Sequence, residues 1–263
     1  MSFTDYYNDL KDNPNNISYW YPKIKDCGIN VPKTLIFDVP ENIVECFFME
    51  GNQQKNMDDV YEWVKTTIMP TLNSSEIGGL IFMKNGAFSN KFDFDSCSIR
   101  ANALEITRNL IEINYTSLMF ETGGNTEVAI RERIPFREDE TPCIYHGMPL
   151  RNEYRVFYDF DNHKALYVVN YWDWDYCHEA ISRNATDKFI YEAVYPQLNQ
   201  HYVDNCECVM NGVAEHMKDI TGLSGIWSID ILEDEHQCFW LIDMALGHRS
   251  AYWDPVKAGV SNG

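Results

Sequence analysis

The alternation of hydrophobic and polar positions predicts a set of strands along the chain. Short runs rich in β-branched and aromatic residues, each bounded by polar or glycine-containing stretches, are typical of strands. We predict strands over residues 31–37, 79–84, 126–135, 154–159, 165–170, 227–232 and 239–244. An early proline marks the first of these as an edge strand. Short polar turns separate the last four runs into two pairs, which predicts two antiparallel hairpins.

Apolar residues at helical spacing predict helices between these strands. We expect a short helix before Gly28, a helix over residues 57–68 that Pro70 ends, and another over 99–113. Residues 186–220 predict a long helical stretch broken near Pro196. Because helices and strands are mixed along the chain, the predicted class is α+β. Three prolines and a glycine over residues 135–150 predict a linker between two α+β halves.

Composition narrows the functions that this fold can serve. The chain has 263 residues, 45% of them hydrophobic, and a formal net charge of −19. Such a surface repels nucleic-acid backbones and anionic membranes, so neither is an expected partner. No apolar run approaches the roughly 20 residues that a membrane span needs, and the first residues lack the pattern of a signal peptide. Eight scattered cysteines are interpreted as reduced thiols, which favours a cytoplasmic location.

Two aspartates in the last predicted hairpin are the most informative polar residues. If a four-residue loop, Glu235–Cys238, closes this hairpin, then Asp234 faces Phe239 and Asp230 faces Asp243. Directly opposed residues have Cβ atoms about 5 Å apart, so the two carboxylates would repel each other unless a cation lies between them. Mg²⁺ suits such a pair. The alternative is two half-exposed aspartates on a solvated face.

The few basic residues include candidates for anion binding. Lys84 ends a predicted strand and precedes a glycine-containing polar loop, in which backbone N–H groups could help it to hold an anion. Ser89 and Lys91 add a hydroxyl and a second cation in that loop. The loop is not a Walker A sequence, and the alternative for Lys84 is plain solvated surface.

Arginines near and beyond the linker are a second group of candidates. Arg155 lies inside an apolar strand and needs a partner if it is buried, either a structural carboxylate or a ligand phosphate. Arg131 and Arg133 lie at a strand end, where they could form a solvated edge or line a cleft. The chain has no Gly-x-Ser-x-Gly motif and no His-x3-His spacing, so neither a serine nucleophile nor a catalytic zinc is indicated.

The order of these features resembles the ATP-grasp superfamily, and most closely its Cdc123/D123-like branch. The matching stretches are residues 81–91, 130–135, 152–157, 228–231 and 240–243. The resemblance covers most of residues 20–245. It implies two α+β lobes with a nucleotide cleft between them. The implied division is an N-terminal region over 1–75, a small lobe over 76–135 and a large lobe with the metal-binding hairpin over 136–263.

The resemblance also implies roles for individual residues. Lys84 and Arg155 would contact the phosphates of ATP and act in catalysis. Asp230 and Asp243 would hold Mg²⁺. The other nucleotide-binding residues that the resemblance implies are Ser89 and Lys91, in the loop, and Arg131, Glu132, Arg133 and Ile134, in the hinge that contacts adenine.

Two functions from different classes follow from this resemblance. The first is an ATP- and Mg²⁺-dependent ligase that joins a carboxylate to an amine or other nucleophile through an acyl phosphate. The alternative is an ATP-binding assembly or interaction factor with little turnover. The family pattern ends its last strand as acid-x-Asn, whereas Ala245 replaces the asparagine here and removes one expected metal ligand. An exposed apolar patch over residues 171–174 would favour the assembly factor, and core packing is the other interpretation of that run.

Overall fold

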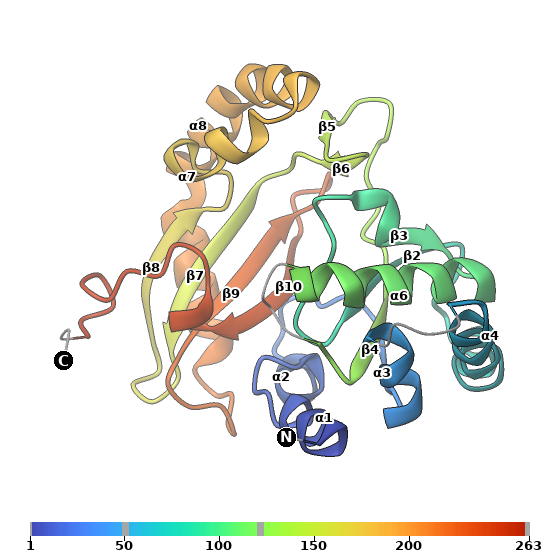
Figure 1. Ribbon diagram of the computed structural model, residues 1–263. Coiled ribbons are helices and arrows are strands. Elements are labelled where there is room, and N and C mark those ends of the chain that lie inside the picture. Colours follow the sequence, from blue (N-terminus) through green and yellow to red (C-terminus); the bar gives the residue numbers. More distant parts are fainter. Residues whose placement is uncertain (1, 49–52, 120–123, 261–263) are drawn as a thin grey trace. The chain divides into compact units, whose positions relative to one another are not determined.

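The computed structural model describes residues 2–48, 53–119 and 124–260, and it divides into two compact units (Figure 1). The N-terminal unit comprises Met1–Ser18 and Lys33–Arg133. The C-terminal unit comprises Tyr19–Pro32 and Ile134–Gly263. Each unit has its own four-stranded antiparallel sheet, so each is described separately.

The sheet of the N-terminal unit has the strand order β1-β4-β2-β3. Its strands are β1 (Thr34–Asp38), β4 (Glu127–Glu132), β2 (Leu80–Asn85) and β3 (Ser98–Arg100). The strand β1 lies at the edge of the sheet, as the early proline of its segment predicted. One face of β2 carries Ile81 and Met83, and Asn85 on that face lies 3.5 Å from the side chain of Asn114 in a helix. This face is therefore covered by helix.

The helices of the N-terminal unit pack mainly on that apolar face and on one another. They are α1 (Phe3–Lys11), α3 (Glu41–Phe48), α4 (Gln53–Trp63), the π-helical η1 (Val64–Ile68), α5 (Met69–Ser74), the 3-10 helix η2 (Phe94–Ser96) and α6 (Ala103–Met119). The helix α2 (Ile17–Ile24) begins in this unit and ends in the other. The helix predicted over 57–68 is seen as α4 followed by η1, which ends at Ile68, and Pro70 lies in the first turn of α5, where proline needs no N–H partner.

The sheet of the C-terminal unit has the strand order β10-β9-β7-β8. The strands β7 (Glu153–Asp159) and β8 (Lys164–Asn170) form one predicted hairpin, and β9 (Ile226–Glu233) and β10 (Phe239–Leu246) form the other. The two hairpins join through the antiparallel pair β7–β9. Within the stretch predicted as a linker, β5 (Cys143–Ile144) and β6 (Met148–Pro149) make a small sheet of their own.

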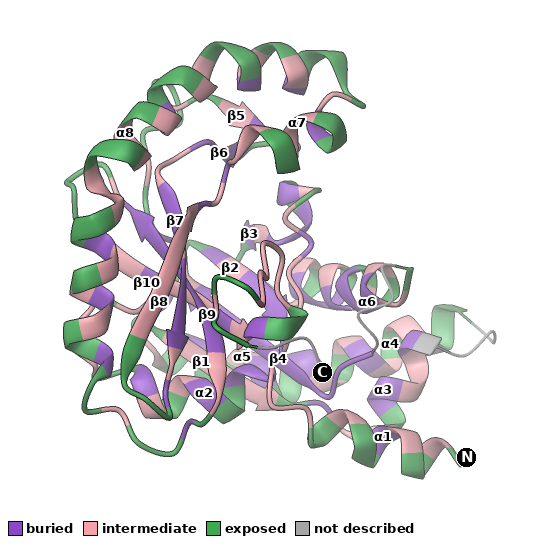
Figure 2. Ribbon diagram, turned by 90° about the vertical axis from the view of Figure 1, so that its left-hand side faces the viewer, coloured by how far each residue is buried: buried purple, intermediate pink, exposed green. Residues whose placement is uncertain are grey.

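The helices of this unit are α7 (Trp174–Ile181), α8 (Ala185–Met217) and the 3-10 turn η3 (Gly247–Arg249). The predicted break at Pro196 is wrong, because α8 runs through it without interruption. A proline inside a helix costs about 3 kcal/mol. Burial of one face of α8 against β8 and β7 offsets this cost, and Figure 2 shows buried positions interrupting the exposed ones along α8.

The aromatic run over residues 171–174 is buried at Trp172. Trp172 is 3% exposed, and its indole nitrogen donates to the carbonyl oxygen of Arg151 at 3.0 Å. The hydroxyl of Tyr191, on α8, donates to the carbonyl oxygen of Trp172 at 2.7 Å. These contacts confirm the core-packing interpretation for Trp172.

The register of the last hairpin agrees with the prediction at one pair and differs at another. Glu233, not Asp234, pairs with Phe239, so the predicted four-residue loop is wrong. Asp230 does pair with Asp243, because a β-bulge between Leu241 and Asp243 shifts the register by one residue. The bulge thus restores the pairing that the longer turn would have removed.

Candidate functional site

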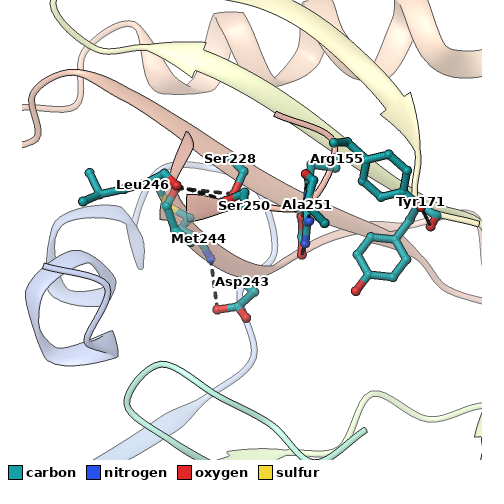
Figure 3. Close-up of polar contacts among 11 residues, drawn as sticks. Arg155, Tyr171, Ser228, Asp243, Met244, Leu246, Ser250 and Ala251 are labelled. Carbon is teal, nitrogen blue, oxygen red and sulfur yellow. Dashed lines mark hydrogen bonds and ion pairs between the residues drawn. The ribbon is translucent and has the colours of Figure 1, made fainter. Parts of the chain in front are cut away.

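Three predicted site residues form one row across the sheet of the C-terminal unit. Arg155 on β7 lies opposite Asp230 on β9, and Asp230 lies opposite Asp243 on β10. Directly opposed residues of neighbouring strands point to the same face of a sheet. We call these three residues the Arg155 row, of which Figure 3 labels Arg155 and Asp243.

Arg155 and Asp230 form a bidentate ion pair. Nε of Arg155 lies 2.7 Å from Oδ1 of Asp230, and Nη2 lies 2.8 Å from Oδ2. The side chains are only 12% and 7% exposed, so solvent screens the pair weakly. Nη1 of Arg155 donates to the carbonyl oxygen of Ala251 at 3.2 Å, and the guanidinium carbon lies 5.0 Å from the ring centroid of Tyr171. Two of the five N–H groups of Arg155 are not used by these bonds.

Electrostatics keep Arg155 charged in this environment. Burial alone would lower the pKa of Arg155. The charge of Asp230 and its hydrogen bonds act in the opposite direction, with smaller contributions from Glu153 and Asp243, and the resulting pKa of Arg155 lies above its ordinary value. The guanidinium is therefore a permanent cation.

The two carboxylates of the row accept hydrogen bonds from different donors. Both oxygens of Asp230 accept bonds from Arg155, whereas Oδ1 of Asp243 accepts the N–H of Met244 at 3.0 Å. A carboxylate has about four lone-pair positions, so a carboxylate that accepts hydrogen bonds can also be a metal ligand. Within residues 2–48, 53–119 and 124–260, no group of three or more His, Cys, Asp and Glu side chains is arranged to hold a metal ion. A metal here would need other oxygen ligands.

A segment near the C-terminus, residues 247–254, is bonded to the same face of the sheet. The hydroxyl oxygens of Ser250 and Ser228 are 2.6 Å apart. The hydroxyl of Tyr252 donates to the carbonyl oxygen of Tyr171 at 2.6 Å. We call this segment the C-terminal cover, and it supplies the carbonyl group that Arg155 binds.

Lys84 lies in the N-terminal unit and is buried. It is 2% exposed and pairs with Ala129 of β4. The next pair on this face is Phe82 with Arg131, so Lys84 and Arg131 share a face, and Glu127 belongs to it too. The interpretation of Lys84 as plain solvated surface is therefore wrong. We call Lys84, Arg131 and Glu127 the Lys84 face.

Glu127 is a residue that sequence reasoning missed. It is 4% exposed, and the hydroxyl and the backbone N–H of Ser18 both donate to its carboxylate. Burial raises the pKa of Glu127 above its ordinary value, while the bonds from Ser18 and the charge of Lys84 act in the opposite direction. A signal existed in the sequence, because Glu127, Ala129 and Arg131 alternate with apolar residues.

Side-chain amides hold the loop that follows Lys84. Oδ1 of Asn85 accepts the N–H groups of Ala87 and Phe88, and Oδ1 of Asn125 accepts that of Gly86 at 3.0 Å. A Cβ atom on Gly86 would lie 2.5 Å from the side chain of Asn125, so glycine is needed for this close approach. The loop carries the predicted residues Ser89 and Lys91, both half-buried. The sequence gives no comparable signal for Asn125.

The predicted hinge connects the two units. Arg131 and Glu132 are the last two residues of β4. Nε of Arg131 donates to Oγ1 of Thr34 at 3.0 Å, and Oε1 of Glu132 accepts the N–H of Lys33 at 2.7 Å. Arg133 is the last residue of the N-terminal unit, and Ile134 is the first of the C-terminal unit in this stretch.

The structure thus groups the predicted residues into two sets. Lys84 and Arg131 share a face in one unit, and Arg155, Asp230 and Asp243 form a row in the other. That both sets contact one nucleotide stays a prediction.

The turn of the last hairpin allows a test by pH. Burial alone would raise the pKa of Asp234, but bonds from Trp240 Nε1 and from the N–H groups of Cys238 and His236 lower it below its ordinary value. A lowered folded-state pKa adds stability at pH values above about 4, and that stability is lost as the pH falls through the folded-state pKa.

We therefore expect acidification to reduce the free energy of unfolding less in Asp234→Asn than in the unmodified protein. Urea unfolding at a series of pH values between about 6 and 2.5 measures this effect. Subtracting one stability curve from the other cancels the contributions of the other carboxylates, which both proteins share. Parallel curves would show that Asp234 makes no such contribution.

The fold of the chain is an ATP-grasp fold of the α+β class. A solved structure of Cdc123 from Schizosaccharomyces pombe matches 96% of this chain over 92% of its own length, with a TM-score of 0.53 and 13% identity. At this identity the likeness is one of fold. No protein-family model matches the chain, and no curated protein matches it in sequence.

Two further solved structures also match, and the chain spans about half the length of each. The biotin carboxylase domain of Hydrogenobacter thermophilus 2-oxoglutarate carboxylase, solved with MgADP, ADP and bicarbonate, has a TM-score of 0.43 and 11% identity, over 97% of this chain and 44% of its own. The VanG D-Ala:D-Ser ligase from Enterococcus faecalis has a TM-score of 0.39 and 10% identity, over 88% and 51%. In the part of the chain that the structure describes, no helix is long and apolar enough to cross a membrane.

Proposed function

We propose that the protein binds ATP together with Mg²⁺ and uses it as an ATP-grasp ligase. The observation that carries the proposal is the Arg155 row, a buried guanidinium beside two opposed carboxylates, in a chain with an ATP-grasp fold. This set combines a fixed cation for phosphate with hard oxygen ligands for a metal ion. The Lys84 face adds a second buried cation.

In this proposal Lys84 and Arg155 bind the phosphate oxygens of ATP. Charge-assisted hydrogen bonds to phosphate are roughly twice as strong as neutral ones, and their strength rises where water is excluded. Asp230 holds the guanidinium plane of Arg155 through two bonds, so little reorganisation is needed when a phosphate arrives. Ser89 and Lys91, in the loop after Lys84, are proposed to contact the same phosphates.

The donor set fits Mg²⁺. This ion commonly takes one or two carboxylates and completes its octahedral shell with water and substrate phosphates, so it needs no cluster of three acidic side chains. Asp230 and Asp243 are the proposed ligands, and both oxygens of Asp230 also accept bonds from Arg155. Ala245 supplies no side-chain oxygen. Bound Mg²⁺ would neutralise charge on the phosphates.

The proposed reaction has two steps. A carboxylate oxygen of the first substrate attacks the γ-phosphorus of ATP, and the bond to the bridging oxygen breaks to release ADP. An amine or another nucleophile then attacks the carbonyl carbon of the acyl phosphate, and inorganic phosphate leaves. The guanidinium of Arg155 and the ammonium of Lys84 stabilise the charge that moves between phosphate oxygens in the first step.

A second candidate is an ATP-binding assembly or interaction factor with little turnover. Two observations favour it. Asp230 is bonded through both oxygens to Arg155, and Ala245 replaces the expected amide ligand, so fewer metal ligands are available than the ligase pattern provides. An ATP-grasp site with one strong metal ligand could bind nucleotide without efficient phosphoryl transfer.

We expect ATP affinity to depend on Mg²⁺ and on Asp243. Loss of one charged ligand contact costs about 1.5–3 kcal/mol, which is roughly tenfold to 150-fold in affinity. Titration calorimetry with ATP, with and without Mg²⁺, measures this for the unmodified protein and for Asp243→Asn.

The matched control is Asp234→Asn, which removes the same charge from the turn of the same hairpin. It should leave both the affinity and its Mg²⁺ dependence nearly unchanged. Equal losses in the two variants, or ATP binding that is indifferent to Mg²⁺, would contradict the metal assignment.

A further inference from the structure

A cavity of about 260 Å³ lies in the C-terminal unit, away from the Arg155 row. Its walls come from α8, from Ile231 on β9, from Phe239 on β10 and from the segment 28–30. Ile231 follows Asp230 in the strand, so its side chain points to the opposite face of the sheet. The cavity is therefore separate from the residues proposed to bind ATP.

Hydrogen bonds hold the wall formed by the segment 28–30. The N–H of Leu241 donates to the carbonyl oxygen of Asn30 at 2.8 Å, which ties the segment to β10. Nδ1 of His216 donates to the carbonyl oxygen of Cys27 at 3.1 Å, which ties it to α8. A Cβ atom on Gly28 would lie 2.7 Å from Nδ1 of His216, so the two elements are in close contact. The cavity is thus preformed, as most small-molecule sites are.

Gly212 is the cavity residue at which a substitution tests the site. It lies within α8 and lines the cavity. Glycine inside a helix costs about 1 kcal/mol relative to alanine. A Cβ atom at Gly212 would meet no other atom within 4 Å, so packing does not require glycine here. Because Gly212 lines the cavity, a larger side chain there is expected to reduce the cavity volume.

The walls select an apolar ligand of limited size. Val209, Val213 and Ile231 are at most 3% exposed, and Phe239 adds an aromatic ring. An engineered apolar cavity of about 150 Å³ admits benzene. A cavity of about 260 Å³ therefore has room for one ring or two fused rings.

The polar atoms at the mouth add a preference for a hydrogen-bond donor. Nδ2 of Asn30 lies 3.3 Å from the carbonyl oxygen of Phe239, which leaves Oδ1 of Asn30 as an acceptor. His216 donates through Nδ1, so in its neutral form Nε2 is an acceptor as well. The lining contains no Asp, Glu, Lys or Arg, so a charged ligand would have no ion-pair partner.

We propose that this cavity binds a neutral aromatic or heteroaromatic molecule of one or two fused rings that carries an N–H or O–H donor. Indole and phenol are members of this class and serve as probes. The proposal is independent of the proposed function, because Gly212 and the wall residues lie outside the Arg155 row and the Lys84 face.

The test is a titration of the full chain with indole, followed by calorimetry and by methyl chemical shifts in NMR. We expect saturable binding at one site, with shifts concentrated at Val209, Val213 and Ile231. Gly212→Leu should weaken the binding at least tenfold, and Gly212→Ala should weaken it less. Because alanine favours the helix, Gly212→Ala also separates loss of the cavity from loss of folding.

Gly78→Leu is the matched control. A Cβ atom at Gly78 likewise meets nothing within 4 Å, and this glycine lies in the N-terminal unit, outside the cavity. Its indole affinity should equal that of the unmodified protein. Absence of saturable binding for both indole and phenol, or equal affinities in the unmodified protein and a folded Gly212→Leu, would overturn the proposal. So would binding of a tryptophan-containing peptide without binding of free indole, which would assign the cavity to a protein partner.

Discussion

Replacing Arg155 with methionine should lower the free energy of unfolding by about 3–5 kcal/mol. The substitution leaves the carboxylate of Asp230, only 7% exposed, without the guanidinium that binds both of its oxygens. It also removes the donor to the carbonyl oxygen of Ala251. Urea unfolding near pH 7, followed by circular dichroism, measures the loss.

The double variant Arg155→Met with Asp230→Leu is the control for this interpretation. It removes the uncompensated charge, so it should regain a large part of the stability that Arg155→Met loses. A loss of less than about 1 kcal/mol in the single variant would be typical of a solvent-screened surface pair, and it would contradict the buried geometry.

Replacing Lys84 with methionine should abolish ADP release from Mg-ATP and weaken ATP binding. Lys84 is buried beside Glu127 and Arg131, and we propose that its ammonium group binds the phosphates. Losing one charge-assisted contact costs about 1.5–3 kcal/mol in binding, and more in a transition state that gathers charge at the same oxygens. The measurements are ADP formation in a broad screen of amino acids, peptides and amines, and calorimetry with ATP.

A control variant and the unmodified protein test the role of Lys84. Lys91→Met removes a half-buried cation from the loop and should have a smaller effect on both measurements. Undiminished ADP release in Lys84→Met would contradict the proposed role. If the unmodified protein binds ATP tightly, releases no ADP throughout the screen and forms a stable complex with another protein, the assembly factor becomes the better assignment.

The two hairpins were predictable because their signals are local. In each hairpin, two strands with alternating hydrophobic and polar residues and the short polar turn between them lie within about twenty residues. The pairing follows from that proximity. The pairing of Asp230 with Asp243 was predicted through a four-residue loop, but it depends on the bulge before Asp243. A bulge changes register without a distinctive residue type here, so the sequence did not reveal it.

The sequence indicated which residues need a partner better than it indicated which distant residue is that partner. The sequence indicated that Arg155 needs a partner and left a carboxylate or a phosphate open. The choice of Asp230 depends on the β7–β9 pairing of two separate hairpins. Glu127 could have been found from alternation with its neighbours. The carbonyl oxygen of Ala251 could not, because every residue offers such a group and the side chain carries no signal.

The pairing of Asn30 with Trp240 has a consequence for how the chain folds during synthesis. The segment Tyr19–Pro32 belongs to the C-terminal unit, and its bond to Phe239 joins residues 209 positions apart. The N-terminal unit has all its strands once Arg133 has been made, but this early segment must wait for β10. At about 5–20 residues per second, the time between the synthesis of Pro32 and that of Phe239 is roughly 10–40 s. The part of that segment that pairs with β10 therefore stays unpaired on the ribosome for seconds, during which chaperones can bind it and folding of the C-terminal unit cannot finish.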